Sequence, residues 1–304
     1  MFVLGFFAIF AAALASTLSL KRNALVGDIR NLSTSMFGFS ALFFAGILWW
    51  ISAQFDLTFS SLDDWAHLRD PRFSLTVFLE TLGVWVARSN YTKNGNNVTA
   101  INFAMFLSII LVPLIAFFAN EPLGFTDTPR LQFSSTTTFL LTLLAFSALI
   151  CIYFLDKFKG KQYIRHWPLL ILAPLLLSCT MFLTGKLIQT YNPFAVAASM
   201  GLVIWLVFLA AALWRREFAL LQRHHTKQLL ILFVIIGLYC LSNMAATKLL
   251  AIELLALFKR TGQVLAATFI DRLYNKGHFL NAKDKGVVTC MLLFGVLLYG
   301  LQQG

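Results

Sequence analysis

Long apolar runs, separated by short charged connections, limit the folds that this chain can adopt. The runs are roughly 17–23 residues long, which is the length that a helix needs to cross the hydrocarbon core of a bilayer. The chain is 59% hydrophobic and only 12% charged, with a mean hydropathy of +0.77. A soluble domain has about 25% charged residues. The sequence therefore predicts an all-α integral membrane protein with many spans.

Ten such runs can be delimited, and the connections between them are too short for a soluble domain. No Lys or Arg precedes the first run, so we interpret it as a span and not as a cleaved signal peptide. The expected spans are 1–20, 34–54, 73–91, 98–118, 134–155, 168–188, 193–213, 228–247, 249–270 and 286–302.

A basic linker at 156–167 divides the chain into a five-span half, 1–155, and a second five-span half, 168–304. Short motifs recur in the two halves, since SNYTK at 89–93 is echoed by SNMAATK at 242–248. Two repeats with an odd number of spans have opposite orientations in the membrane. The sequence thus predicts ten helices in two inverted five-helix repeats, an architecture in which the substrate site lies at the midplane.

The distribution of cations predicts an orientation. Of the 24 Lys and Arg residues, 17 lie in or beside the loops that follow odd-numbered spans and 5 in or beside the loops that follow even-numbered spans. The positive-inside rule then places the odd loops in the cytoplasm and both termini outside. The same rule accounts for the net charge of +11, so we expect no nucleic-acid partner.

Lys259 and Arg260 lie side by side within the ninth apolar run. A cation at that depth is costly unless it meets a partner, a water-filled cavity or an anionic ligand. The two side chains point about 100° apart on a helix, so only one of them can face a ligand squarely. Arg260 shares a helix face with Glu253, which is seven residues away, and Gln263 lies close to that face.

Glu80 in the third run is the other buried carboxylate candidate. A desolvated Glu can bind a proton near neutral pH, which makes Glu80 a candidate for proton coupling. The alternative is that Glu80 and Glu253 neutralise Lys259 and Arg260 as structural pairs. Aromatic and amide side chains of spans 3, 4 and 8 are weaker candidates for a central cavity, with helix packing as their alternative role. They are Trp85, Asn90, Tyr91, Asn102, Tyr239 and Asn243.

Several classes of site have no signal in the sequence. The four cysteines are isolated within apolar runs and have no metal-ligand spacing. No nucleotide-hydrolysis motif is present, and the acidic loop at 55–72 lacks the spacing of a metal or catalytic site. We therefore expect no cofactor, no metal and no enzymatic activity.

The arrangement resembles the drug/metabolite transporter superfamily, in particular its EamA-type members, over essentially the whole chain. The stretch 253–300 looks like the last two spans of that family, and 99–122 is similar to its counterpart in the first repeat, with Pro113 late in the helix and Glu121 just after it. Gly185-Lys186 followed by Tyr191-Asn192-Pro193 resembles the family's connection between spans 6 and 7.

The Lys259-Arg260 pair also resembles the pair with which the distantly related sugar-phosphate translocators hold phosphate. Two features depart from the family. Asn275-Lys276 replaces the Glu expected after span 9, and family members usually keep both termini in the cytoplasm, whereas the charge rule places them outside.

The resemblance and the buried charges imply a secondary transporter that moves a small polar or anionic metabolite by alternating access. Exchange of phosphorylated sugars or nucleotide sugars is the alternative within that class, and a membrane-embedded transferase for a lipid-linked substrate is the alternative outside it. The expected partners are a small-molecule substrate, the lipid bilayer and protons as coupling ion, in a monomer or a homodimer. A bacterial inner membrane is favoured over a eukaryotic organelle membrane.

Overall fold

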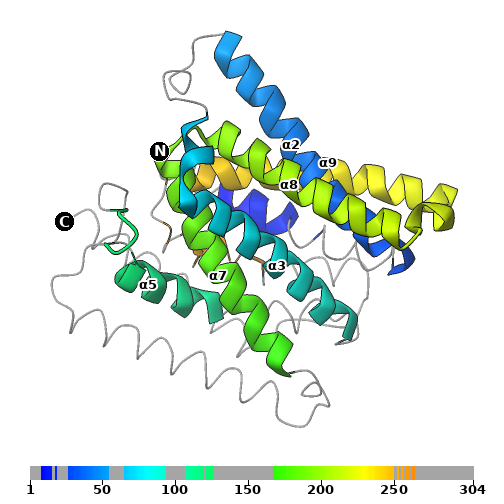
Figure 1. Ribbon diagram of the computed structural model, residues 1–304, viewed down its shortest axis with the longest axis horizontal. Helices are drawn as coiled ribbons and strands as arrows, with labels where there is room; N and C mark the ends of the chain where they lie inside the picture. Colours follow the sequence, from blue (N-terminus) through cyan, green and yellow to red (C-terminus); the bar gives the residue numbers. More distant parts are fainter. Residues whose placement is uncertain are drawn as a thin grey trace. The chain divides into compact units, whose positions relative to one another are not determined.

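A computed structural model describes residues 8–15, 18, 27–54, 65–93, 107–119, 121–125 and 167–249, together with seven positions between 252 and 263. These residues form helices and turns, and no strand occurs among them. The long helices are α2 (Arg30–Gln54), α3 (Pro71–Lys93), α5 (Leu107–Ala119), α7 (Trp167–Thr190), α8 (Pro193–Trp214) and α9 (Arg223–Leu249) (Figure 1). Short 3-10 helices occupy Gly27–Ile29 (η1), Ala66–Arg69 (η2) and Glu217–Leu220 (η4).

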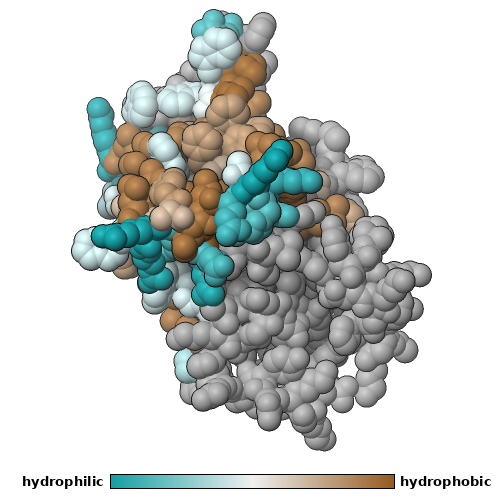
Figure 2. Space-filling view, turned by 90° about the vertical axis from the view of Figure 1, so that its right-hand side faces the viewer, coloured by the Kyte–Doolittle hydropathy of each residue, from teal (hydrophilic) through white to brown (hydrophobic). Residues whose placement is uncertain are grey.

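Four of these helices are long and apolar enough to cross a membrane: the segments are Arg30–Ser52, Ile171–Thr190, Pro193–Trp214 and Arg223–Met244. They are 20 to 23 residues long. Large apolar side chains remain on their outer surfaces, and Figure 2 shows hydrophobic residues over much of the described surface. The described part of the chain is therefore all-helical and compatible with a multi-pass membrane protein.

Helices occur at five of the predicted spans, and four of these helices are apolar enough to cross a membrane. Spans 34–54, 73–91, 168–188, 193–213 and 228–247 coincide with α2, α3, α7, α8 and α9. Helix α5 covers the later part of 98–118, and the described residues of 1–20 and 249–270 are helical. Spans 134–155 and 286–302 lie outside the described residues.

The chain divides into two compact units, which we describe separately. The first contains 1–81 and 183–249, and the second contains 82–182 and 250–304. In the first unit, apolar residues of α2, α8 and α9 form buried clusters, one of them around Ile29, Leu232 and Ile236. A second buried cluster adds residues of α3 and of the end of α7 to those of α2, α8 and α9, so all five helices contribute to the core of this unit.

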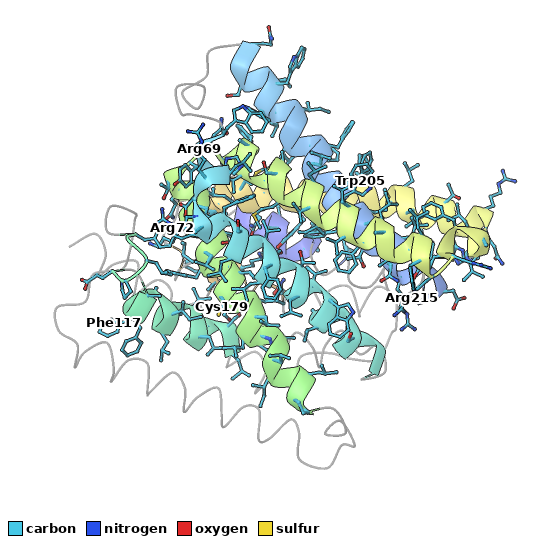
Figure 3. The ribbon with its side chains drawn as sticks, viewed as in Figure 1. Arg69, Arg72, Phe117, Cys179, Trp205 and Arg215 are labelled. Atoms are coloured by element: carbon cyan, nitrogen blue, oxygen red, sulfur yellow. The ribbon has the colours of Figure 1, made fainter. Side chains whose placement is uncertain are left out.

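Two glycines let α2 and α8 approach closely. A Cβ added at Gly38 would lie 2.3 Å from the backbone nitrogen of Trp205, and one added at Gly201 would lie 2.6 Å from that of Leu42. The contact is reciprocal, because each glycine also faces the carbonyl oxygen of the other. Each is the ninth residue of its helix. Beside the crossing, the ring of Phe39 in α2 is 5.5 Å from that of Trp205 in α8 (Figure 3).

A carboxylate that is distant in sequence accepts hydrogen bonds at the start of α2. Glu217, which follows α8, accepts hydrogen bonds from the backbone N–H of Leu32 at 2.9 Å and from Nδ2 of Asn31 at 2.6 Å. The first backbone N–H groups of a helix have no partner within the helix, and a carboxylate there also complements the helix dipole. The end of α8 therefore lies beside the start of α2, so the two helices run antiparallel.

In the second unit, α5 packs against the helical residues after position 250. Val112 of α5 forms a buried cluster with Ile252 and Ala256, and Met181 of α7 packs against it. The rings of Phe125 and Phe182 meet edge to face at 5.9 Å. This core is apolar, like that of the first unit.

Candidate functional site

Polar side chains in the first unit gather where α3 and α8 begin. Asp70 directly precedes Pro71 at the start of α3, and Asn192 directly precedes Pro193 at the start of α8. An Asp or Asn before a Pro is a typical helix start, since the side chain accepts from the first N–H groups and Pro fits the first turn. Asn192 accepts from the backbone N–H of Phe194 at 3.0 Å.

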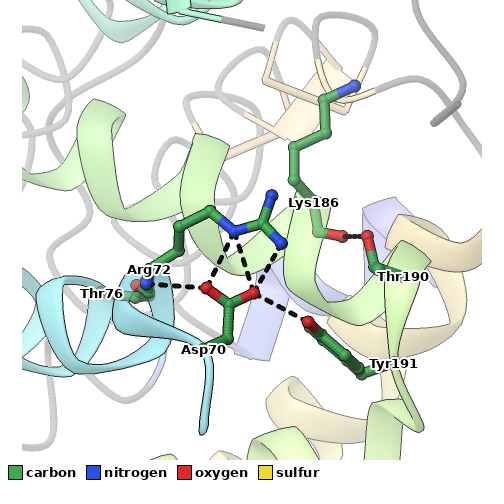
Figure 4. A network of polar contacts seen from close by, with 6 residues as sticks. All are labelled: Asp70, Arg72, Thr76, Lys186, Thr190 and Tyr191. Carbon is green, nitrogen blue, oxygen red and sulfur yellow. Dashed lines mark hydrogen bonds and ion pairs between the residues drawn. The ribbon is translucent and has the colours of Figure 1, made fainter. Parts of the chain in front are cut away.

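Asp70 joins the two helix starts. Its Oδ1 accepts from the backbone N–H of Arg72 at 2.8 Å, and the Arg72 guanidinium holds both carboxylate oxygens, with Nη2 2.6 Å from Oδ2. The hydroxyl of Tyr191 donates to the same Oδ2 at 2.8 Å. Because Tyr191 precedes Asn192, this bond fixes the turn between α7 and α8 against the start of α3 (Figure 4).

The electrostatics of this cluster favour the ion pair. Burial alone would raise the pKa of Asp70, but hydrogen bonds from Arg72 and Tyr191 and the Arg72 charge lower that pKa below its ordinary value. The hydrogen bond to Asp70 in turn raises the pKa of Arg72. Burial, together with the hydrogen bond to Asp70, raises the pKa of Tyr191. The aspartate stays ionised and the tyrosine stays protonated at neutral pH.

His67 extends the cluster towards α8. Its ring is fully buried, with Nε2 3.0 Å from the hydroxyl oxygen of Ser199, and it meets the ring of Phe73 edge to face. Hydrogen positions on the imidazole depend on the tautomer, so either group of the His67–Ser199 pair can be the donor. The contact ties the segment before α3 to the second turn of α8.

Lys186 lies one helical turn before the end of α7 and is fully buried. Its neighbours Leu187 and Ile188 belong to an apolar core cluster. The hydroxyl of Thr190 donates to the Lys186 carbonyl oxygen at 2.8 Å, and Figure 4 shows the side chain extending from α7 away from the Asp70 carboxylate. A cation in such surroundings is costly unless charges or polar groups meet it.

The predicted span 168–188 contains Lys186, although the family resemblance compared Gly185-Lys186 with the connection between spans 6 and 7. Helix α7 continues to Thr190, so Lys186 belongs to the helix and its side chain to the interior. The helix ends two residues after the predicted span, which is an ordinary difference at a helix end. The sequence analysis did not single out Lys186 as a buried cation.

The polar residues after Lys186 face α9. Nε2 of Gln189 donates to the carbonyl oxygen of Thr247 at 3.1 Å, and the hydroxyl of Thr247 donates to the carbonyl oxygen of Asn243 at 2.7 Å. Gln189 follows Lys186 by three residues, so the two share one face of α7. The predicted candidate Asn243 therefore lies on the part of α9 that meets the end of α7.

The predicted candidates in the ninth run are partly described. Lys259 and Gln263 are buried and lie four residues apart in helical conformation, so they share one helix face. Arg260 and Glu253 lie outside the described residues, as does Asn102 in the fourth run.

The remaining candidates differ in exposure. Glu80 on α3 and Tyr239 on α9 are half-buried, and the ring of Tyr239 lies 6.1 Å from that of Phe37 on α2. Trp85 is 55% exposed. Asn90 and Tyr91 lie within α3, but their side chains are outside the described residues.

Sequence analysis did not single out Asp70, Arg72 or His67. Asp70 and Tyr191 are 121 residues apart, and their contact has no local signature. The Asp-Pro and Asn-Pro pairs are a local signal, since each marks a helix start whose cap is a polar side chain.

These observations define a helical protein that is compatible with the membrane, with a buried cation beside a polar cluster that fixes two helix starts. No protein-family model matches the chain, and no curated protein shows significant similarity to it.

Proposed function

We propose that this protein is a secondary transporter that moves a small anionic or polar metabolite by alternating access. The proposal includes ten helices in two inverted repeats, as in the drug/metabolite transporter superfamily, and a place in a bacterial inner membrane. Exchange of phosphorylated sugars or nucleotide sugars is a special case of the same function.

The burial of Lys186 is the observation that carries the proposal. The residue is fully buried in α7, within a segment of membrane-spanning length. A charged residue in an apolar span is retained chiefly where it serves a substrate or ion pathway. Lys259 is the second buried cation among the described residues of the apolar runs. Each of these cations, taken within its own unit, is a candidate for contact with an anionic substrate.

The crossing of α2 and α8 supports inverted repeats. Helix α2 is the second span of the first half and α8 is the second span of the second half. Equivalent helices of inverted repeats run antiparallel, as these two do, and a two-fold axis would pass between Gly38 and Gly201, which hold the same position in their helices.

The loop contacts support the alternation of spans across a bilayer. Tyr191, in the loop after span 6, binds Asp70 in the loop after span 2. Glu217, after span 7, binds Asn31 and Leu32 before span 2. In a ten-span protein, Tyr191 and Asp70 both lie in loops that follow even-numbered spans, and these loops share one side of the membrane. Glu217 and its partners Asn31 and Leu32 lie in or beside loops that follow odd-numbered spans, on the opposite side.

Glu80 is the proposed proton-coupling residue. It is half-buried on α3, where a carboxylate can exchange a proton with one side of the membrane and stay partly desolvated. Glu80→Gln should remove the dependence of transport on a proton gradient. Retained dependence would assign coupling to another residue.

A thermal-shift screen of the purified protein tests the substrate class. Phosphate monoesters, nucleotide sugars, dicarboxylates and uncharged sugars are compared, because binding at 100 times Kd stabilises the folded state by about 2.7 kcal/mol. We expect an anionic class to raise the melting temperature and Lys186→Gln to abolish that increase. Lys186→Arg, which keeps the charge, separates loss of charge from loss of folding.

The exposed Arg69→Gln is the control that should bind normally. An unchanged response of Lys186→Gln would refute the role of Lys186.

A further inference from the structure

The connection between α8 and α9, together with the start of α9, carries a concentration of exposed cations. Four basic residues lie within thirteen positions, and all four are exposed: Arg215, Arg216, Arg223 and Lys227. The exposed His224 lies among them. We call this set of four the basic connection.

The backbone of the basic connection is hydrogen-bonded, whereas its charged side-chain groups have no partner among the described residues. The N–H of Arg215 donates to the carbonyl oxygen of Ala211 at 3.1 Å, and that of Arg216 donates to Leu213 at 3.0 Å. Within the described part of the chain, the side chains of the basic connection make no hydrogen bond or ion pair. Figure 3 shows the Arg215 side chain projecting from the end of α8.

The nearest acidic residue in sequence is already engaged. Glu217 is buried, and both of its carboxylate oxygens accept hydrogen bonds at the start of α2. Its charge is therefore directed inward, and the outer surface of the connection keeps its positive potential.

Large apolar side chains are interleaved with these cations. Trp214 is 88% exposed, and Phe218, Leu220 and Leu221 are between 40% and 50% exposed. Figure 2, which views the right-hand side of Figure 1, shows hydrophilic side chains projecting beside apolar surface. A segment with exposed aromatic and aliphatic side chains among Lys and Arg is typical of the membrane–water interface.

We propose that the basic connection is a binding site for anionic phospholipid headgroups of the leaflet beside the odd loops. The guanidinium and ammonium groups bind the headgroup phosphates, and the exposed apolar side chains lie against the upper acyl chains. Because the charge distribution places the odd loops in the cytoplasm, the occupied leaflet is the cytoplasmic one. The site requires a membrane protein, but it does not depend on transport.

The test titrates short-chain phosphatidylglycerol or phosphatidylcholine into the detergent-solubilised full chain and measures the apparent Kd from the thermal shift. The main variant combines Arg215→Gln, Arg223→Gln and Lys227→Gln. Arg216 stays unchanged because its backbone is left-handed, with φ of 54°. The charge-preserving control combines Arg215→Lys with Arg223→Lys.

We expect phosphatidylglycerol, and not phosphatidylcholine, to bind the wild-type protein. Each cation near an anionic surface contributes about fivefold in affinity, so the triple variant should bind about a hundredfold more weakly. The Lys control should bind within a few-fold of wild type, and added salt should weaken binding.

Equal affinity of the triple variant and the wild-type protein for phosphatidylglycerol would overturn the proposal. Displacement of the lipid by inorganic phosphate at low millimolar concentration would also overturn it, because the site would then serve a soluble anion.

Discussion

The close crossing of α2 and α8 makes Gly38→Ala a sharp test of the fold. The added Cβ would lie 2.3 Å from the backbone nitrogen of Trp205, whereas an ordinary contact begins at 3.4 Å. Backbone atoms cannot rotate away, so the helices must separate by about 1 Å over this contact. Overpacking of a core typically costs about 1–3 kcal/mol, and loss of dispersion contacts along the separated helices adds to that cost. We expect Gly38→Ala to lower the free energy of unfolding by at least 2 kcal/mol.

Gly46→Ala is the matched control, because it makes the same change in the same helix with no heavy atom near the new methyl group. Both substitutions replace Gly by a better helix former, worth about 1 kcal/mol. Gly46→Ala should therefore be neutral or stabilising. Gly237→Ala should cost less than Gly38→Ala, because its Cβ meets the ring of Phe44, which can rotate. Thermal unfolding of the three purified variants in one detergent measures the order. Equal stability of Gly38→Ala and Gly46→Ala would refute the described crossing.

Two further predictions concern buried carboxylates of the first unit. Glu217→Gln should destabilise the protein by about 2 kcal/mol, because the amide has one acceptor oxygen and cannot replace both carboxylate oxygens, which accept from Leu32 and Asn31. The exposed Glu121→Gln is the control and should be neutral in the same unfolding assay. Asp70→Asn should lower stability at neutral pH and flatten its dependence on acid. The folded pKa of Asp70 lies below the ordinary value of 3.8, so its contribution is complete above that pH and is lost as pH falls through the folded pKa. Stabilities that change in parallel between neutral pH and pH ~3 for wild type and Asp70→Asn would contradict the described bonds of Asp70 to Arg72 and Tyr191.

Apolar run length was sufficient to predict the helices that the structure describes. Helices α2, α7, α8 and α9 coincide with predicted spans because a run of apolar residues long enough to cross a bilayer has few other ways to satisfy its backbone. Helix α3 also coincides with a predicted span, although it is not one of the four helices apolar enough to cross a membrane. The residues at which the helices begin and end were less predictable. Helix α9 begins at Arg223, five residues before the predicted 228, because polar residues can continue a helix beyond its apolar part.

The candidate site was less predictable than the helices. The burial of Lys259 fits a pattern that the sequence makes visible, since the residue lies deep within an apolar run. Lys186 lies near a run's end, where sequence alone does not distinguish a buried side chain from one that reaches solvent. The Asp70–Tyr191 and Glu217–Leu32 bonds join residues more than a hundred positions apart, and only the packing of the helices brings them together.

Counterflow in liposomes tests transport most directly. Liposomes containing the protein are loaded with an unlabelled anion from the class selected by the binding screen, and uptake of the labelled anion is measured against protein-free liposomes. We predict uptake by the wild-type protein, and its loss both in Lys186→Gln and in the variant that combines Lys259→Gln with Arg260→Gln. Lys186→Arg should retain part of the uptake, because it keeps the buried positive charge. Absence of uptake by folded wild-type protein for every anion that it binds would contradict the account, as would full uptake by the neutralised variants.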